Sequence, residues 1–411
     1  MSDFREGLKA DAEKVKEKPA MLGPDVDIGK FSLKTVQVEP ISSPDKLAPQ
    51  IAERAQEVGI NTDENSRSGT FFQHDHSVIL ACQKKEIEGV DILSTSQALK
   101  QYDWLKDYWW KAVAVEMDKY TATAEIHQTG GYFIRSKPGV RLTMPVQACL
   151  FIGTQGLLQS VHNMIIAEED SELHIITGCT THPQVSSGMH IGISEFYVKK
   201  GATITFTMIH GWAEEVEVRP RTGAIIEEGG TFISNYICFK PVKSLQMYPV
   251  SYLMGRDSRV RYHTLLYGCG NSMLDVGSKA VLSGEGAKAE MTARAIGKDS
   301  AQIIARGYLV GEKAETKGHL ECRGLLLSDK AKIHAIPELD AKTDGCNLSH
   351  EAAVGKIEEA QLCYLMSRGL NEDEATALIV RGFLDPEVPG LPEQIKQEVK
   401  RTVKLTSEKV M

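Results

Sequence analysis

The segment TDGCNLSHEAAVGK, residues 343–356, carries three side chains that can bind a metal within six positions. They are the thiol of Cys346, the imidazole of His350 and the carboxylate of Glu351, and a second thiol, Cys322, precedes them in GHLECRGLLLSDKAKIH. Thiolate is the soft ligand that iron–sulfur clusters and zinc prefer, while imidazole and carboxylate are weaker replacements. These residue types indicate a site that holds its metal temporarily. The alternatives are a catalytic site and a helix start that is rich in polar side chains.

Motifs for other chemistries are incomplete in this chain. HEAAV at residues 350–354 begins like the zinc-protease helix H-E-x-x-H, but Val354 occupies the place of the second histidine ligand. GCGNSM at residues 268–273 lacks the third glycine of a dinucleotide fingerprint, and no G-x-x-x-x-G-K-[ST] loop or G-x-S-x-G elbow occurs. We therefore expect no protease activity and no ATP site in this chain.

Composition and length set the limits on fold and location. The 411 residues exceed the usual size of one globular core, which predicts two or three domains or one elongated solenoid. A net charge of −8 argues against nucleic acid or an anionic membrane as the main partner. The chain shows neither a membrane span nor a secretion signal, and its eight cysteines form no C-x-x-C pair. We expect a cytoplasmic protein with free thiols.

The hydrophobic period divides the chain into three parts. Residues 1–130 are mixed and partly helical, and from about residue 131 the period becomes two. A turn-like phrase then recurs at intervals of 31, 28, 28, 29, 27 and 17 residues, marked by Ser171, Ala202, Gly230, Ser258, Ala287, Ala314 and Ala331. This repeat predicts a parallel β-helix over residues 131–348, with a β-sandwich as the alternative.

Residues 349–411 are expected to form a helical domain. KIEEAQLCYLMSRGL ends at Gly369, Asn371 and Glu374 match a capping box for the next helix, and a third helix begins near Pro392. Three short amphipathic helices bury little by themselves, so this domain should dock on a partner. The repeat length puts Cys322 and Cys346 on neighbouring coils, with His350 just beyond, so the expected metal site is a pocket at this end.

Residues 347–386, NLSHEAAVGKIEEAQLCYLMSRGLNEDEATALIVRGFLDP, resemble the C-terminal signature of the SufB/SufD family, the scaffold subunits of an iron–sulfur cluster assembly machine. Residues 178–212 and 318–330 are also similar to the family. The resemblance implies a mainly β fold, with a right-handed parallel β-helix between an N-terminal region and a C-terminal helical domain. It also implies that the helical domain binds an ABC-type ATPase, and that two scaffold subunits pair through the ends of their β-helices.

The resemblance also assigns roles to single residues. Cys322 matches the cysteine on which the SufB-like scaffold assembles its cluster, and Glu351 matches a proposed ligand beside it. The sequence Ser-His-Glu around His350 combines the SufB-like and SufD-like patterns, which suggests one SufB-like chain that acts as a homodimer. Cys346 has no certain counterpart and stays a candidate ligand.

A second implication is a sulfur route through the β-helix. Cys179 matches the family's sulfur-accepting cysteine and Trp212 a residue that lines the route, while His210 stands where glutamine is common. The resulting prediction is a non-enzymatic scaffold that holds a transient cluster and passes it to acceptor proteins, with a flavin left undecided. The alternatives are an accessory structural subunit without a cluster and a carbohydrate-active β-helix protein.

Overall fold

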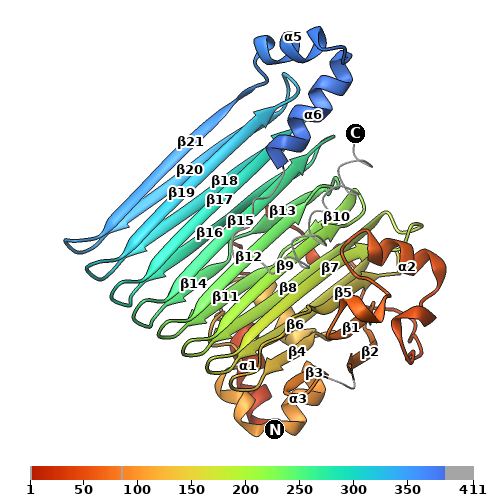
Figure 1. The fold of residues 1–411 in the computed structure, drawn as a ribbon. Helices are drawn as coiled ribbons and strands as arrows, with labels where there is room; N and C mark the ends of the chain where they lie inside the picture. Colours follow the sequence, from red (N-terminus) through yellow and green to blue (C-terminus); the bar gives the residue numbers. More distant parts are fainter. Residues whose placement is uncertain (1, 85–86, 385–411) are drawn as a thin grey trace.

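Two parallel β-sheets stack face to face as the chain winds through successive turns of a solenoid (Figure 1). The computed structural model describes residues 2–84 and 87–384. Within this part of the chain, all strand pairs are parallel except β1 with β2 and β3 with β4. The predicted parallel β-helix is confirmed, and the β-sandwich alternative is wrong.

Sheet B has ten strands in the spatial order β2-β1-β5-β7-β9-β12-β15-β17-β19-β21. Their bounds are β1 (Gly69–His74), β2 (Ser77–Gln83), β5 (Val146–Ile152), β7 (Glu172–Thr181), β9 (Thr203–Gly211), β12 (Thr231–Cys238), β15 (Arg259–Gly268), β17 (Lys288–Gly297), β19 (Lys317–Leu326) and β21 (Asn347–Lys356).

Sheet A has eleven strands and faces sheet B across the interior. Their bounds are β3 (Val90–Ser94), β4 (Tyr132–Ser136), β6 (Leu157–Ala167), β8 (Ser187–Val198), β10 (Glu215–Val218), β11 (Arg221–Ile226), β13 (Ser244–Met247), β14 (Val250–Leu253), β16 (Met273–Leu282), β18 (Gln302–Gly311) and β20 (Lys332–Ala341). The pairs β10 with β11 and β13 with β14 each share one turn, because the chain interrupts the strand at Pro220 and at Pro249, which lack a backbone N–H donor.

The recurring phrase of the sequence forms the corners that lead into sheet B. The markers Ser171, Ala202, Gly230, Ser258 and Ala287 each lie directly before a sheet B strand. The residue before each marker has a positive φ: Asp170, Gly201, Gly229, Asp257 and Gly286. Aspartate and glycine are among the residues that adopt this conformation most readily, which explains the polar-then-small phrase. The last interval of 17 differs because Ala331 leads into β20 of sheet A.

Helices pack against parts of the outer faces of the sheets. They are α1 (Ser2–Lys14), α2 (Pro49–Gln56), α3 (Thr95–Gln101), α4 (Lys119–Ile126), α5 (Glu359–Ser367) and α6 (Glu372–Leu384), with 3₁₀ turns at Ile28–Lys30, Pro44–Lys46, Glu64–Ser66 and Asp103–Asp107. Helices α1, α3 and α4 pack beside sheet A, and α2 packs beside sheet B (Figure 1). None of the helices in the described part of the chain is long and apolar enough to cross a membrane.

The N-terminal region is anchored to sheet A by a fully buried carboxylate. Glu195 of β8 accepts hydrogen bonds from the backbone N–H groups of Trp110 at 2.8 Å, Ala112 at 2.7 Å and Val113 at 3.1 Å. The Nε2 atom of His162 lies 2.8 Å from the Oε2 of Glu195, and the hydroxyl of Tyr197 donates to its Oε1 at 3.3 Å. One buried side chain therefore provides an acceptor for three backbone N–H groups of this loop.

The boundaries of the three parts differ from the sequence interpretation. Strands β1 and β3 lie inside residues 1–130, yet each joins a sheet of the solenoid. Residues 349–356 belong to β21, and the helices begin only at Glu359. Alanine, glutamate and histidine tolerate a helix, but pairing with β19 overrides that local preference. The capping box is confirmed, since Asn371 and Glu374 exchange hydrogen bonds, and the helix expected near Pro392 lies outside the described residues.

Candidate functional site

Cys322 lies in the middle of β19 and points into the solenoid. Its side chain is 2% exposed and belongs to the apolar interior between the two sheets. The next turn covers it, because Cys322 pairs with Ala352 of β21. Burial, followed by the nearby charge of Glu321, raises the pKa of Cys322 to about 11. At neutral pH this group is therefore a thiol, and it must lose its proton before it can bind a metal.

His350 and Glu351 of β21 lie on opposite faces of sheet B. His350 pairs with Leu320, an inward residue, whereas Glu351 pairs with Glu321, whose side chain forms an ion pair with Arg323 on the outer face. Side chains alternate along a strand, so His350 shares the inward face with Cys322 and Glu351 does not. From strand spacing and rise, the Cα atoms of Cys322 and His350 are about 8 Å apart.

Cys346 lies at the corner before β21, away from Cys322. It is one residue before Asn347, which pairs with Lys317 of β19, so along the strands it is displaced from Cys322 by roughly 20 Å. Although slight burial raises its pKa, hydrogen bonds with Thr316 and Thr343 lower the pKa of Cys346 below its ordinary value. The structure brings Cys346 onto the coil next to Cys322, as expected, but not into the same pocket.

The end of the solenoid that carries these residues is open. Strands β20 and β21 are largely exposed, in contrast to the buried strands of earlier turns. Leu339 and Val354 are 38% and 42% exposed there, although both are apolar. In the described part of one chain, no group of three or more histidine, cysteine, aspartate or glutamate side chains is arranged to hold a metal ion.

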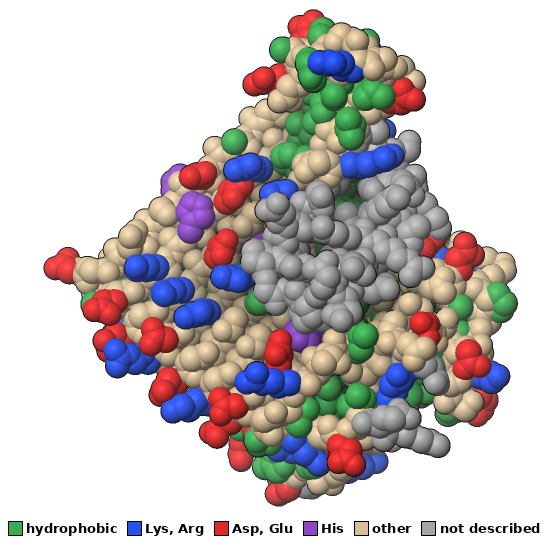
Figure 2. All heavy atoms as spheres, in the orientation of Figure 1, with side chains coloured by type: hydrophobic (Ala, Val, Ile, Leu, Met, Phe, Trp, Pro, Cys, Tyr) green, Lys and Arg blue, Asp and Glu red, His purple; other side chains and the backbone are tan. Residues whose placement is uncertain are grey.

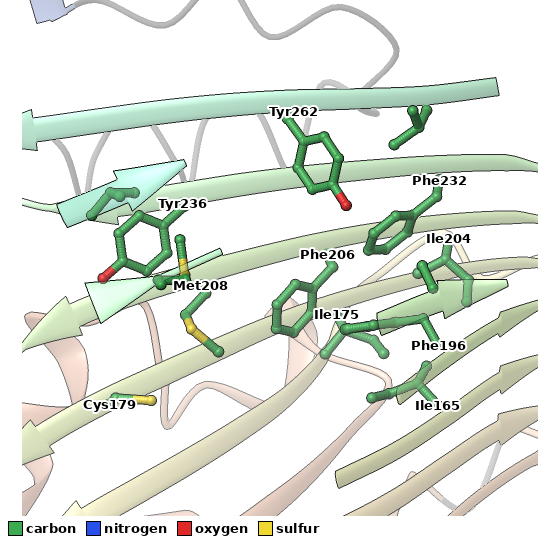
Figure 3. Packing of buried hydrophobic residues seen from close by; sticks show 14 of the residues in the cluster. Ile165, Ile175, Cys179, Phe196, Ile204, Phe206, Met208, Phe232, Tyr236 and Tyr262 are labelled. Atoms are coloured by element: carbon green, nitrogen blue, oxygen red, sulfur yellow. The ribbon is translucent and has the colours of Figure 1, made fainter. Parts of the chain in front are cut away.

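Cys179 lies deep inside the solenoid on β7, far from the open end. It is fully buried and pairs with His210 of β9, which in turn pairs with Cys238 of β12, so these three inward residues form one ladder across the interior. Figure 3 shows Cys179 in this interior with Met208 and Tyr236. The ladder brings together the thiols of two strands with a histidine between them.

Aromatic rings and imidazoles gather next to this ladder. The Nδ1 atom of His210 lies 2.7 Å from the hydroxyl of Tyr236, and its Nε2 has no hydrogen-bond partner. The ring of Trp212 lies 5.7 Å from the ring of His210 and 4.9 Å from the ring of His190. Burial lowers the pKa of His210 well below its ordinary range and that of His190 to about 3, so both are neutral.

The three residues expected along a sulfur route are thus brought together by the structure, at one point of the interior. Burial raises the pKa of Cys179 far above its ordinary value and that of Cys238 to about 12. Five strand steps separate β7 from β19, which corresponds to about 24 Å between Cys179 and Cys322. Close to Cys322 the interior contains a small cavity, lined among others by Tyr262, Met291 and Cys322 itself.

Sequence reasoning missed several residues of this interior cluster. His190, Tyr236 and Cys238 belong to no motif, and they meet Cys179 only through the register of the turns. The repeat of about 28 residues was the available signal, since Cys179, His210 and Cys238 follow one another at 31 and 28 residues. An exact register for each turn would have been needed to use it.

Comparison with known proteins identifies the family. Residues 150–383 match the model described as SUF system FeS cluster assembly, SufBD core domain. An iron–sulfur cluster assembly SufBD family protein of Methanothermobacter thermautotrophicus is 50% identical over 408 residues, covering 98% of this chain and 99% of the relative. A homologue of the same description from Archaeoglobus fulgidus is 50% identical over 353 residues, covering 86% and 94%. SufB of Bacillus subtilis is 29% identical over 371 residues, covering 89% and 79%. The chain belongs to the SufBD family of iron–sulfur cluster assembly proteins.

Proposed function

We propose that this chain is a scaffold on which an iron–sulfur cluster is assembled and from which it is passed to acceptor proteins. The observation that supports this best is the shared inward face of Cys322 and His350 at the open end of the solenoid. Thiolate and imidazole together are a ligand set that binds iron but releases it more readily than four thiolates. The cluster is cargo, and the chain itself catalyses no reaction.

The proposed ligand set is completed by a second copy of the chain. Among the described strands, β20 and β21 are the last of their sheets, and their exposed edges and apolar side chains favour association with another protein surface. Two copies related by a two-fold axis would bring two Cys322 and two His350 side chains to one interface. Glu351 faces outward in the single chain, so in this proposal it needs a change in β21 to become a ligand.

Access to Cys322 is proposed to depend on an ABC-type ATPase that binds α5 and α6. Only Ile357 and Glu358 separate the end of β21 from α5, so a pull on the helices acts directly on the strand that covers Cys322. Figure 2 shows hydrophobic side chains gathered over the helices at this end, and Tyr364, Met366 and Leu378 are 58%, 43% and 50% exposed. ATP hydrolysis belongs to that partner in this proposal, because this chain has no phosphate-binding loop.

Sulfur is proposed to enter at Cys179 and to travel through the interior to Cys322. His210 lies between Cys179 and Cys238 in this ladder, and burial lowers its pKa, so it remains neutral beside the two thiols. Because Cys179 is fully buried, the route needs an opening step before a donor can reach it. The protein is proposed to work in the cytoplasm, where its cysteines stay reduced.

Anaerobic reconstitution of the full chain with iron, sulfide and the ATPase partner tests this proposal. Iron content and visible absorption are compared for the wild type, Cys322→Ser, His350→Ala and Cys346→Ser. We expect Cys322→Ser to abolish the cluster, His350→Ala to make it labile and Cys346→Ser to leave it intact. A wild-type chain that acquires no cluster would favour the accessory-subunit alternative, and a cluster that survives Cys322→Ser would move the site elsewhere.

A further inference from the structure

A large hollow lies on the outer face of sheet A, on the side of the sheet away from the interior that holds Cys322. Its volume is about 740 Å³, within the range of small-molecule sites. One wall is the N-terminal segment Lys18–Leu22 with Met117, and the other is the sheet itself. The sheet contributes Arg221, Gln246, Tyr248, Val250, Lys279, Arg306, Tyr308 and Glu338.

The hollow forms where sheet A is interrupted. Tyr248 and Pro249 separate β13 from β14, and the break at Pro220 lies one turn away. Proline cannot donate to the strand ladder, so regular pairing stops at both points and the outer face opens. Beyond the break, Val250, Lys279 and Tyr308 are in register on successive strands, about 4.8 Å apart.

The segment that forms the other wall is held in position by contacts outside the hollow. The backbone N–H of Lys119 donates to the carbonyl of Lys18 at 2.8 Å, and the guanidinium of Arg219 donates to the carbonyl of Pro24 at 3.2 Å. Between these two anchors, Met21 is 86% exposed, and Met117 beside it is 38% exposed. Thioether side chains pack well against aromatic rings. The side chains of Met21 and Met117 are exposed to solvent in the hollow that Tyr248 and Tyr308 also line.

Two polar groups in the hollow lack the partners that their neighbours have. The guanidinium groups of Arg221 and Arg306 are each paired with an aspartate, at 2.7 Å and 2.6 Å. Among the described residues, Lys279 has no carboxylate in ion-pair distance, and its ammonium group lies 4.5 Å from the centre of the Tyr308 ring. Gln246 is 3% exposed, and its buried Oε1 has no hydrogen-bond donor. A buried acceptor without a donor costs stability, which a ligand N–H can recover.

We propose that this hollow binds a small planar aromatic molecule that carries a negative charge. The ring packs between Tyr308 and the thioethers of Met21 and Met117, and the anionic group pairs with Lys279. A ring or amide N–H donates to Gln246. The site is independent of the cluster and does not rest on the proposed function.

Calorimetric titration of the full chain with naphthalene-1-sulfonate, and with the uncharged naphthalene-1-sulfonamide, tests this site. We expect one saturable site for the sulfonate. Lys279→Met should weaken the sulfonate about fivefold to tenfold and leave the sulfonamide unchanged, since an ion pair of this kind contributes about 1 kcal/mol. Tyr308→Leu should weaken both probes. Lys288→Met, which removes an exposed lysine from sheet B, is the matched control and should change neither.

Two results would overturn the proposal. One is the absence of saturable sulfonate binding, and the other is sulfonate binding that is the same in the wild type and in Lys279→Met. If Tyr308→Leu fails to fold, Lys279→Met still decides, because Lys279 is half-buried at the surface and its side chain supports no hydrogen bond in the described structure. A crystal soaked with the sulfonate should show the ring beside Tyr308.

Discussion

Alkylation of single cysteines tests whether the last turn protects Cys322, the proposed cluster ligand. The perturbation is iodoacetamide at pH 7.5, and the two thiols compared are Cys322 and Cys346, which lie on neighbouring turns. Only the thiolate reacts, so the rate depends on how far each pKa lies above the pH and on access to the sulfur.

The expected ratio of rates follows from these two factors. With a pKa of about 11, Cys322 has roughly 1 thiolate in 3,000 at pH 7.5. An ordinary thiol has at least about 1 in 30, and Cys346 has a larger thiolate fraction than that because hydrogen bonds with Thr316 and Thr343 lower its pKa. Ionisation therefore favours Cys346 by about 100-fold, and the greater nucleophilicity of the more basic thiolate reduces this to roughly tenfold. Burial of Cys322 adds further protection, so we expect Cys346 to react more than tenfold faster.

Mass spectrometry of peptides from timed samples measures both rates in one experiment. In guanidinium chloride the two cysteines should react at similar rates, which controls for sequence effects. The Cys322 rate should rise about tenfold per pH unit from pH 7 to 9, because its pKa lies above that range. Equal rates for Cys322 and Cys346 in the folded chain would refute the reasoning, since they would mean that β21 does not cover β19 in solution.

Four further predictions concern stability and assembly. Glu195→Ala should lower the free energy of unfolding by about 3–6 kcal/mol in guanidinium titrations, because three backbone donors lose their acceptor, whereas Glu195→Gln should cost less. Gly201→Ala should lower the melting temperature, because its φ is +66° and a Cβ would approach Asp170 Oδ1 to 2.2 Å. Leu378→Glu should abolish binding of the proposed ATPase partner in a pull-down while leaving the melting temperature unchanged, because Leu378 is half exposed. Stability should fall as the pH drops below 6.5 toward 3, since His190 is held neutral in the folded chain and must gain a proton on unfolding; His190→Gln should flatten this part of the pH profile.

The sequence predicted the solenoid well because its signal is local and repeated. A corner that needs a positive φ selects aspartate or glycine, and this choice recurs at Asp170, Gly201, Gly229, Asp257 and Gly286. The prediction of the helical end was good where it depended on local contacts, as in the exchange of hydrogen bonds between Asn371 and Glu374. Local chemistry determines both features, so no long-range information was needed.

The site was less predictable because it depends on which face of the sheet each side chain occupies and on the pairing register of the strands. A shift of one residue along a strand moves a side chain to the opposite face of the sheet. The sequence alone did not distinguish His350, which faces inward, from Glu351, which faces outward. Cys346 was close in sequence to His350 but lies at a corner, where its partner is Thr316. The interior cluster around His210 includes Tyr236, whose contribution requires the pairing of β9 with β12.

The strand register also explains why the last turn of sheet B is exposed. In every earlier turn of sheet B, the side chain at the position of His350 is covered by the next turn: Leu320 by His350, and Met291 by Leu320. No described strand follows β21 in sheet B, so His350 is exposed while Leu320 is 1% exposed. A second surface that completes the last turn would bury His350 and close the space next to Cys322 in one step. Completion of the core and completion of the proposed ligand set would then be a single event, so a change that opens that interface also releases what it holds.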